Sequence, residues 1–264
     1  MASALNLDAY FARIGWRGAT DPDFATLAGL LKAHTAKIPF ENLDVLLGQT
    51  PRLDLEGLQD KLVTRCRGGY CFEHATLLAA VLTELGFRPA AHAARVVLMR
   101  PKEQSPRGHM FLTVALGGES YLVDPGFASY SAREPLPFRA GDFNSNQSHV
   151  LTRNGDFWTL HVRRDGVLIP GWVTRLEPEH PIDFEVSNHW TATSPASPFT
   201  QVVMMSAVTP QGRVNVMNRD VTLPGGETRQ LADRKELRQL LAAHFGFDLP
   251  KAESMKVPAV AEWR

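Results

Sequence analysis

The sequence contains little cysteine and has no excess of either charge. Only two cysteines, Cys66 and Cys71, occur among its 264 residues. Such scarcity disfavours a secreted scaffold held by disulfides and fits a reducing compartment. Lysine and arginine together number 28, as do aspartate and glutamate. A chain with balanced charge lacks the basic surface that nucleic acids and anionic membranes attract, so we expect neither as a partner.

Long apolar runs and targeting signals are missing as well. The apolar run at residues 77–82 is far shorter than a bilayer span. The first residues, MASALNLDAYFARIGW, lack the charged segment followed by an apolar core that is typical of a signal peptide. We therefore expect a cytoplasmic protein. Its hydrophobic content of 44% suffices for one large core or a few smaller ones.

The patterns along the chain predict helices first and strands later. Helical spacing of apolar residues predicts helices over 7–14, from Asp21-Pro22 onward, over 55–64 and over 72–85. Between 90 and 205, short β-branched and aromatic runs predict antiparallel strands, with a loop or domain crossover at 188–200. A further strand pair is expected at 215–223 and a closing helix at 234–247. This order favours an α+β fold over a doubly wound sheet.

The two cysteines admit several interpretations. Free cysteines are often small buried hydrophobes. Zinc binding is poorly supported, because the C-x4-C spacing is unusual for ligands and no second cysteine pair exists. A disulfide between residues this close is disfavoured in a reducing compartment. The remaining interpretation is a nucleophile at Cys71.

The position of Cys71 suits a nucleophile. It follows Gly68-Gly69-Tyr70 and begins a segment with helical periodicity. Unpaired N–H groups and the positive dipole end at a helix N-terminus favour thiolate over thiol and can stabilise an oxyanion. Such a nucleophile requires a base and a group that orients the base.

The central strands supply both groups. HMFLTVAL and ESYLVD flank Gly117-Gly118, a dipeptide that favours a two-residue hairpin. In that register Leu116 pairs with Glu119, and His109 and Asp124 lie diagonally on one face of the strand pair. An odd-length loop would place them on opposite faces. A histidine in a strand is more often structural, but a neighbouring carboxylate and an unusual cysteine favour a catalytic role.

Four motifs then identify a family. IPFENLDVLLG, RGGYCFEH, HMFLTV and YLVDPGF, in this order between residues 10 and 127, resemble the arylamine N-acetyltransferase family. The remaining residues have a suitable length for the third domain of that family but carry weaker signals.

The resemblance implies a fold and an activity. It implies a helical bundle at 1–88, a central antiparallel β-barrel at 89–195 and an α/β lid at 196–264, with a core like that of cysteine proteases and transglutaminases. It implies acetyl transfer from acetyl-coenzyme A to aromatic amines, hydrazines or arylhydroxylamines by a ping-pong mechanism. No metal is expected. The implied catalytic triad is Cys71, His109 and Asp124.

Other residues receive supporting roles. The resemblance implies that Arg67 and Glu41 form an ion pair beneath the nucleophile, and that Phe127 lines the acceptor pocket. Phe40 is a second candidate for that pocket, although it also fits an ordinary core position.

No phosphate-binding glycine motif is present, so candidates for the coenzyme site rest on position alone. Arg107 and Gly108 precede His109 directly, and Gly126 follows Asp124. Each offers a guanidinium or a backbone N–H to a phosphate.

Three positions depart from the pattern that is common in this family. Ala75 stands where asparagine is frequent, and Pro125 and Ala128 stand where valine and glycine are frequent. None removes a catalytic group, but they bear on substrate preference and coenzyme affinity.

Other functions remain open at this point. An amide synthase of the same fold would use a longer acyl donor, and a thiol hydrolase would use the same three catalytic groups. A small-molecule binding protein with an inactive triad is the non-catalytic alternative.

Overall fold

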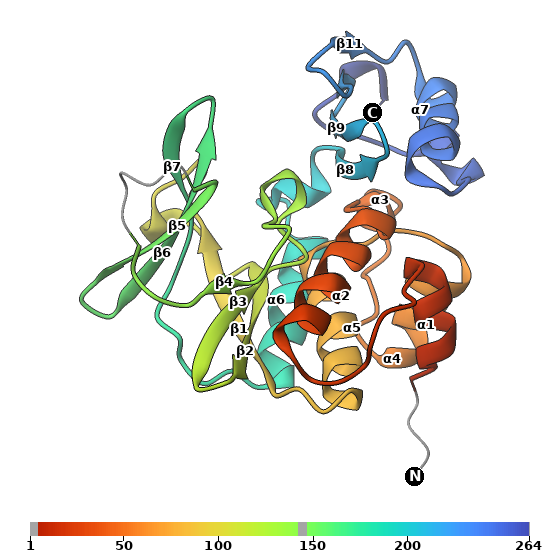
Figure 1. Ribbon diagram of the computed structural model, residues 1–264. Coiled ribbons are helices and arrows are strands. Elements are labelled where there is room, and N and C mark those ends of the chain that lie inside the picture. The colour runs from red at the N-terminus through yellow and green to blue at the C-terminus, as the bar shows by residue number, and fades with distance from the viewer. Residues whose placement is uncertain (1–4, 142–146, 264) are drawn as a thin grey trace.

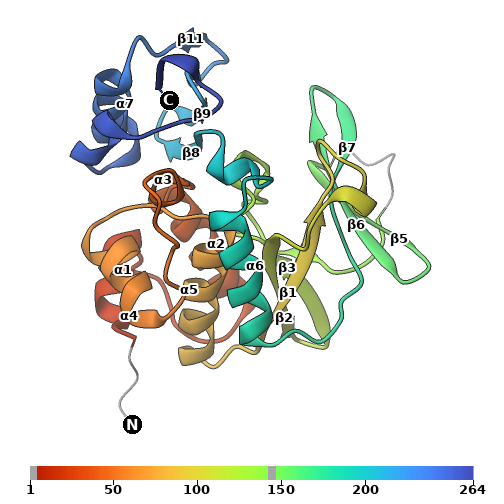
Figure 2. The same ribbon diagram turned by 180° about the vertical axis from the view of Figure 1, so that it is seen from behind.

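The structure is a computed structural model that describes residues 5–141 and 147–263. Figures 1 and 2 show three parts: helices at the N-terminal end, a curled sheet beside them, and a C-terminal part that packs over the helices near α3. The α+β class predicted from the order of the patterns is therefore confirmed. None of the described helices is long and apolar enough to cross a bilayer.

The N-terminal helices largely follow the predicted ranges. The helix expected over 7–14 has the predicted bounds, and the one expected over 55–64 forms with its second half as a π-helix. The predicted start at Asp21-Pro22 is wrong, because the carboxylate of Asp23 accepts the N–H of Thr26 at 2.8 Å and caps the helix later. The elements are α1 Leu7–Ile14, α2 Phe24–Lys37, α3 Leu43–Leu46, α4 Leu55–Leu58, η1 Gln59–Thr64 and α5 Cys71–Glu84.

Seven antiparallel strands form the central sheet, in the order β4-β3-β2-β1-β7-β6-β5. Where the family resemblance implied a barrel, the described residues form an open, curled sheet with β4 and β5 at its edges. The strands are β1 Pro89–Val96, β2 His109–Leu116, β3 Glu119–Val123, β4 Leu136–Pro137, β5 His149–Asn154, β6 Phe157–Arg164 and β7 Val167–Thr174.

The hairpin of β2 and β3 has the predicted register. Leu116 pairs with Glu119 across Gly117-Gly118, whose φ angles of 60° and 84° suit a tight turn. His109 is the first residue of β2, and Asp124 follows β3 directly. The turn therefore brings these two residues to the same end of one strand pair.

A helix after the sheet was not predicted. Residues 181–193 form α6, where we expected strands and the start of a loop. Pro181 is the first helical residue, and the carboxylate of Asp183 accepts the N–H of His180 at 2.8 Å. Its apolar residues Ile182 and Val186 are exposed, so the helix lacks the apolar face that reveals a helix in a sequence.

The C-terminal part contains a second, smaller sheet. The predicted strand pair at 215–223 and the helix from 234 are confirmed. Its elements are β8 Met204–Thr209, β9 Gly212–Met217, β10 Asp220–Thr222, β11 Thr228–Gln230, α7 Arg234–Leu240 and the π-helix η5 Leu241–Phe245. Short 3-10 segments are η2 Lys102–Gln104, η3 Ala128–Tyr130, η4 Pro198–Thr200, η6 Pro250–Ser254 and η7 Ala261–Trp263.

Three apolar clusters hold these parts together. One lies among the helices and extends to the near face of β1 and β2, with α6 contributing Phe184 and Ala192. A second surrounds the stacked rings of Phe111 and Trp172 in the sheet. The third fills the C-terminal part and includes Leu43 of α3. Cys71 belongs to the first cluster, so the nucleophile candidate lies where helices meet the sheet.

Candidate active site

Cys71 is the first residue of α5 and is 2% exposed. Tyr70 caps the helix, and the carboxylate of Glu73 accepts its backbone N–H at 3.0 Å. The N–H groups of the first helical turn have no acceptor within the helix. The sulfur therefore lies beside donors and a positive dipole end, as the sequence predicted.

The two glycines before Tyr70 lie where a Cβ would collide with neighbouring atoms. A Cβ at Gly68 would lie 2.2 Å from the carbonyl oxygen of Pro39. A Cβ at Gly69 would lie 2.7 Å from Oε2 of Glu73. The N–H of Gly69 donates to the same Pro39 carbonyl at 3.1 Å. The turn that leads into α5 thus lies directly against the segment that contains Pro39.

His109 and Asp124 meet as the hairpin register predicted. Nε2 of His109 lies 2.9 Å from Oδ2 of Asp124, and both residues are 2% exposed. The indole N–H of Trp172 donates to the same Oδ2 at 3.0 Å, and the N–H of Gly126 donates to Oδ1 at 3.3 Å. Trp172 on β7 was missed, because only the pairing of β7 with β1 brings it to this carboxylate.

The sulfur of Cys71 lies beside the start of β2. Its thiol donates to the backbone carbonyl of Gly108 at 3.7 Å, one residue before His109. Burial lowers the pKa of His109, but the charge and hydrogen bond of Asp124, together with the adjacent Cys71, outweigh burial and raise it to about 10. The imidazole of His109 is therefore held in its protonated form at neutral pH.

Gly126 fits tightly against the nucleophile candidate. A Cβ there would lie 2.4 Å from the Cα of Cys71. Because only glycine permits this approach, the loop after Asp124 lies directly on the first turn of α5. This contact gives Gly126 a steric role at the site in addition to the coenzyme role predicted for it.

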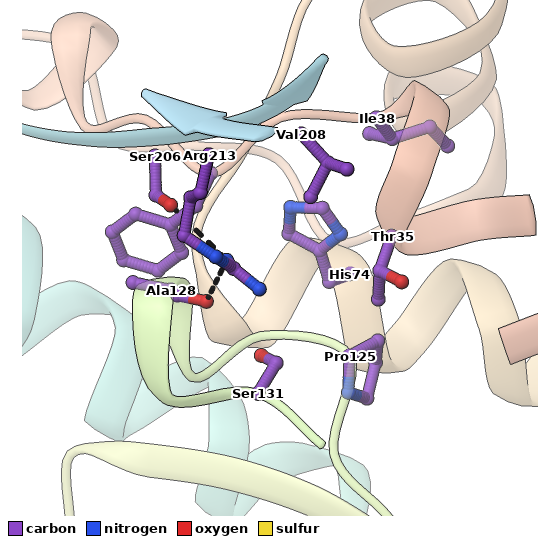
Figure 3. Close-up of a pocket in the computed structure, with 10 residues that line it drawn as sticks. Thr35, Ile38, His74, Pro125, Ala128, Ser131, Ser206, Val208 and Arg213 are labelled. Atoms are coloured by element: carbon purple, nitrogen blue, oxygen red, sulfur yellow. Dashed lines mark hydrogen bonds between the residues drawn. The ribbon is translucent and has the colours of Figure 1, made fainter. Parts of the chain in front are cut away.

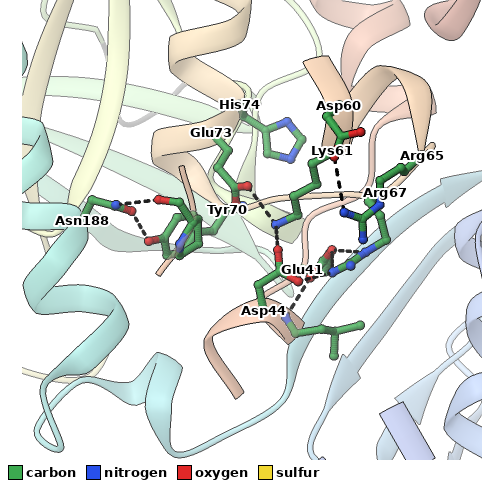
Figure 4. A network of polar contacts seen from close by, with 12 residues as sticks. Glu41, Asp44, Asp60, Lys61, Arg65, Arg67, Tyr70, Glu73, His74 and Asn188 are labelled. Atoms are coloured by element: carbon green, nitrogen blue, oxygen red, sulfur yellow. Dashed lines mark hydrogen bonds and ion pairs between the residues drawn. The ribbon is translucent and has the colours of Figure 1, made fainter. Parts of the chain in front are cut away.

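A buried network of charges lies under this turn (Figure 4). Arg67 pairs with Glu41 at 2.6 Å and with Asp44 at 2.9 Å, and Lys61 pairs with Asp44 at 2.7 Å and with Glu73 at 2.8 Å. Burial raises the pKa of Glu73 to about 7, against the opposing effect of Lys61. The expected pair of Arg67 and Glu41 is present, but no sequence pattern indicated Lys61 and Asp44. The network connects α3, η1 and the start of α5.

A small pocket of about 310 Å³, including its part open to solvent, lies between α2, α5, the loop after Asp124 and the C-terminal sheet (Figure 3). Ala128 in its wall has φ = 50°, in the region that favours glycine. The guanidinium of Arg213 donates to the carbonyl of Ala128 at 3.0 Å and to Oγ of Ser206 at 3.2 Å. The lining residues are Thr35, Ile38, Phe40, His74, Pro125, Ala128, Ser131, Ser206, Val208 and Arg213.

Of the other residues predicted for the site, Phe127 contacts His109, whereas Phe40 and Arg107 have other partners. The ring of Phe127 is centred 5.0 Å from that of His109, so it packs directly on the imidazole. Phe40 lies in the pocket wall, with its ring 6.3 Å from that of Phe199. Arg107 forms ion pairs with two carboxylates, Glu177 at 3.3 Å and Glu179 more closely.

Metal ligands are not grouped at this site. Within residues 5–141 and 147–263, no three side chains of histidine, cysteine, aspartate or glutamate converge as a metal site would require.

Comparisons with known proteins identify one family. A family model described as N-acetyltransferase matches residues 23–254. An arylamine N-acetyltransferase of Mycolicibacterium smegmatis is 37% identical, with 98% of each chain covered. The structure of an M. smegmatis arylamine N-acetyltransferase superimposes with a TM-score of 0.87 at 36% identity, covering 97% of each chain. That of the Mycobacterium marinum enzyme in complex with CoA gives 0.86 at 33% identity, covering 94% of each.

The fold and the relatives together define an enzyme of the acyltransferase class. More particularly, the chain belongs to the arylamine N-acetyltransferase family.

Proposed function

We propose that this protein transfers an acetyl group from acetyl-coenzyme A to an aromatic amine, hydrazine or arylhydroxylamine through an acetyl-Cys71 intermediate. The observation that supports this most directly is the contact between His109 and Asp124, 2.9 Å apart and buried beside the sulfur of Cys71. Family membership supports the donor and acceptor classes, and a relative has been solved with CoA.

The reaction begins with the sulfur. Asp124 accepts a hydrogen bond from Nε2 of His109, which leaves Nδ1 as the ring nitrogen available to Cys71. The thiolate of Cys71 attacks the thioester carbonyl, and backbone N–H groups at the start of α5 stabilise the oxyanion. Coenzyme A leaves as a thiol with the proton from His109. The acetyl group remains on Cys71.

The acceptor completes the cycle. The amine attacks the acetyl carbonyl, His109 receives its proton, and the thiolate of Cys71 is released. Acetyl transfer between two sulfurs is nearly balanced in free energy, so the intermediate persists until an acceptor arrives. Water must be excluded meanwhile, and the buried imidazole under the ring of Phe127 supports such exclusion. We propose that Phe127 and Phe40 contact the acceptor ring.

The coenzyme-binding residues are proposed from position. Gly108 and Gly126 both touch Cys71, so they are adjacent to any bound thioester. Arg107 is engaged by Glu177 and Glu179, and binding a phosphate would require it to exchange those partners. Among the three, Arg107 therefore has the weakest support.

A division into parts at 1–88, 89–195 and 196–264 accompanies this proposal. The separate apolar clusters of helices, sheet and C-terminal part support it, although Phe184 and Ala192 of α6 pack with the helices. The likeness of the core to cysteine proteases and transglutaminases stays a prediction from the family resemblance.

Mass spectrometry after exposure to acetyl-coenzyme A tests the proposal. We expect an acetyl adduct on Cys71 that Cys71→Ala abolishes and that an aromatic hydrazine removes. Absence of any adduct would indicate a binding protein instead. Equal release of coenzyme A with and without hydrazine would indicate a hydrolase, and reaction only with longer acyl chains on a carrier protein would indicate an amide synthase.

A further inference from the structure

A chain of hydrogen bonds connects α1 to the segment beneath the nucleophile. The hydroxyl of Tyr10 lies 2.9 Å from Nδ1 of His34, and Nε2 of His34 lies 2.9 Å from Nδ1 of His74. Nε2 of His74 lies 3.2 Å from the carbonyl oxygen of Pro39. The three side chains are at most 1% exposed. The triad chemistry uses none of them.

When both imidazoles are neutral, every hydrogen bond of this series is donated in the same direction, from Tyr10 toward Pro39. The carbonyl of Pro39 only accepts, so Nε2 of His74 carries the proton that it donates. In a neutral ring Nδ1 of His74 must then accept, and His34 must donate from its own Nε2. Nδ1 of His34 in turn accepts the hydroxyl proton of Tyr10. Every polar atom of the chain has a partner in this state.

Burial keeps both imidazoles neutral. Burial lowers the pKa of His74 to about 4, and it lowers the pKa of His34 well below its ordinary value, with the charge of Arg13 and a protonated His74 acting in the same direction. Around His74, the backbone carbonyls of Pro39 and Gly69 and the carboxylate of Asp124 favour a proton, and Lys61 opposes one. A proton added to His74 would reverse the chain and leave the hydroxyl proton of Tyr10 without its acceptor.

The carbonyl of Pro39 has a second donor. It accepts the N–H of Gly69 at 3.1 Å and lies where a Cβ of Gly68 would be. His74 therefore holds the carbonyl against which the turn before Cys71 is packed. His74 is also three residues after Cys71 on α5, so its side chain links the first turn of this helix to the segment that contains Pro39.

We propose that His74 is a positioning residue for Cys71, and that His34 and Tyr10 act through it by fixing its tautomer. The proposal rests on Cys71 being the nucleophile of the proposed function. The Nε2–H of His74 holds the carbonyl of Pro39 in place. That carbonyl holds the turn at Gly69, and the turn sets the direction in which the sulfur of Cys71 faces His109.

Two substitutions at His74 separate its two bonds. The amide of Gln reaches the position of Nε2 and can donate to Pro39, whereas the amide of Asn reaches only the position of Nδ1 and can accept from His34. The quantity to measure is the rate at which iodoacetamide alkylates Cys71. Peptide mass spectrometry resolves this reaction from the alkylation of Cys66. His74→Asn should slow alkylation by about tenfold or more, since a displacement of about 1 Å at reacting groups costs up to about a hundredfold in rate. His74→Gln should keep most of the rate.

Two further variants complete the test. One changes Tyr10, which is distant from Cys71 in sequence, and the other changes the control residue His92. Tyr10→Phe removes the donor to His34, frees that ring to change tautomer and should also slow alkylation, although Tyr10 lies on α1. His92→Asn is the matched control, because His92 is a partly buried histidine of β1 whose pKa burial lowers to about 4 and which contacts Thr113 at 2.8 Å. It should lower stability without changing alkylation.

The outcomes separate this inference from the proposed function. Equal alkylation rates in wild type, His74→Asn and Tyr10→Phe, each shown folded by circular dichroism, would overturn the positioning role. So would equal slowing in His74→Asn and His74→Gln. The assay contains no acetyl-coenzyme A, so a failure of acetyl transfer in wild type would refute the proposed function and leave this inference standing on the alkylation rates.

Discussion

Gly126→Ala is the substitution whose effect the structure determines most sharply. The added Cβ would lie 2.4 Å from the Cα of Cys71 and 3.0 Å from its Cβ. Both contacts are to atoms that cannot rotate away, because one is backbone and the other is fixed by it. Gly126 has an ordinary φ, so backbone strain makes no contribution and the effect is steric.

The displacement can be worked out from that distance. The optimal van der Waals separation between carbon atoms is about 3.5–4 Å, so the loop or the first turn of α5 must move by about 1 Å or more. Overpacking of this kind costs about 1–3 kcal/mol of unfolding free energy. A misplacement of about 1 Å at reacting groups costs about a hundredfold in rate. We therefore expect a folded protein with about 1% of the wild-type kcat/KM.

Two measurements distinguish this steric effect from lost coenzyme binding. Alkylation of Cys71 by iodoacetamide reports the geometry of the sulfur without any coenzyme, and KM for acetyl-coenzyme A reports binding. Gly141→Ala is a matched control, because its Cβ would meet Val150 at an ordinary 3.4 Å. We expect slower alkylation in Gly126→Ala and wild-type behaviour in Gly141→Ala. Unchanged alkylation with a raised KM would refute the steric reasoning and favour coenzyme binding by Gly126.

Three further predictions concern the buried polar groups. Asp124→Asn should lower kcat by about 10³–10⁴-fold, because an amide no longer holds His109 in its working tautomer; adduct formation at the wild-type rate would contradict this. Trp172→Phe should keep the stacking on Phe111 but lose a hydrogen bond to a buried carboxylate, which costs about 1.5–3 kcal/mol in urea unfolding; an unchanged midpoint would exclude that contribution. The pKa of His74 is lowered to about 4 in the folded state, so the unfolded chain binds the extra proton first and stability falls as pH drops from 6.5 to 4. The loss reaches about 3 kcal/mol, and His74→Gln should remove this part of the acid sensitivity, as urea titrations at several pH values would reveal.

Local patterns predicted the parts of the site that depend on neighbours in sequence. Helical periodicity after Tyr70 placed Cys71 at a helix N-terminus, one residue from the predicted helix start. The Gly117-Gly118 turn fixed the register that brings His109 and Asp124 together, because a two-residue turn leaves only one pairing.

Contacts between distant segments were not predictable in the same way. The donor Trp172 lies 48 residues from Asp124, and nothing in its local sequence indicates a carboxylate partner. The helix α6 was missed because its exposed Ile182 and Val186 obscure the amphipathic pattern. The role of His74 was not predicted, because its partners His34 and Pro39 lie 40 and 35 residues away in sequence.

The sequence by itself determined the α+β class and the family, and it predicted the three residues of the proposed triad, because short-range turns, caps and periodicity act between residues close along the chain. Only the tertiary structure decided which groups surround that triad: Gly126 against Cys71, Trp172 on Asp124, and the charge network under Arg67. The physical reason is that burial and hydrogen bonding between remote segments depend on how whole elements pack, and the residues involved have no fixed spacing in sequence.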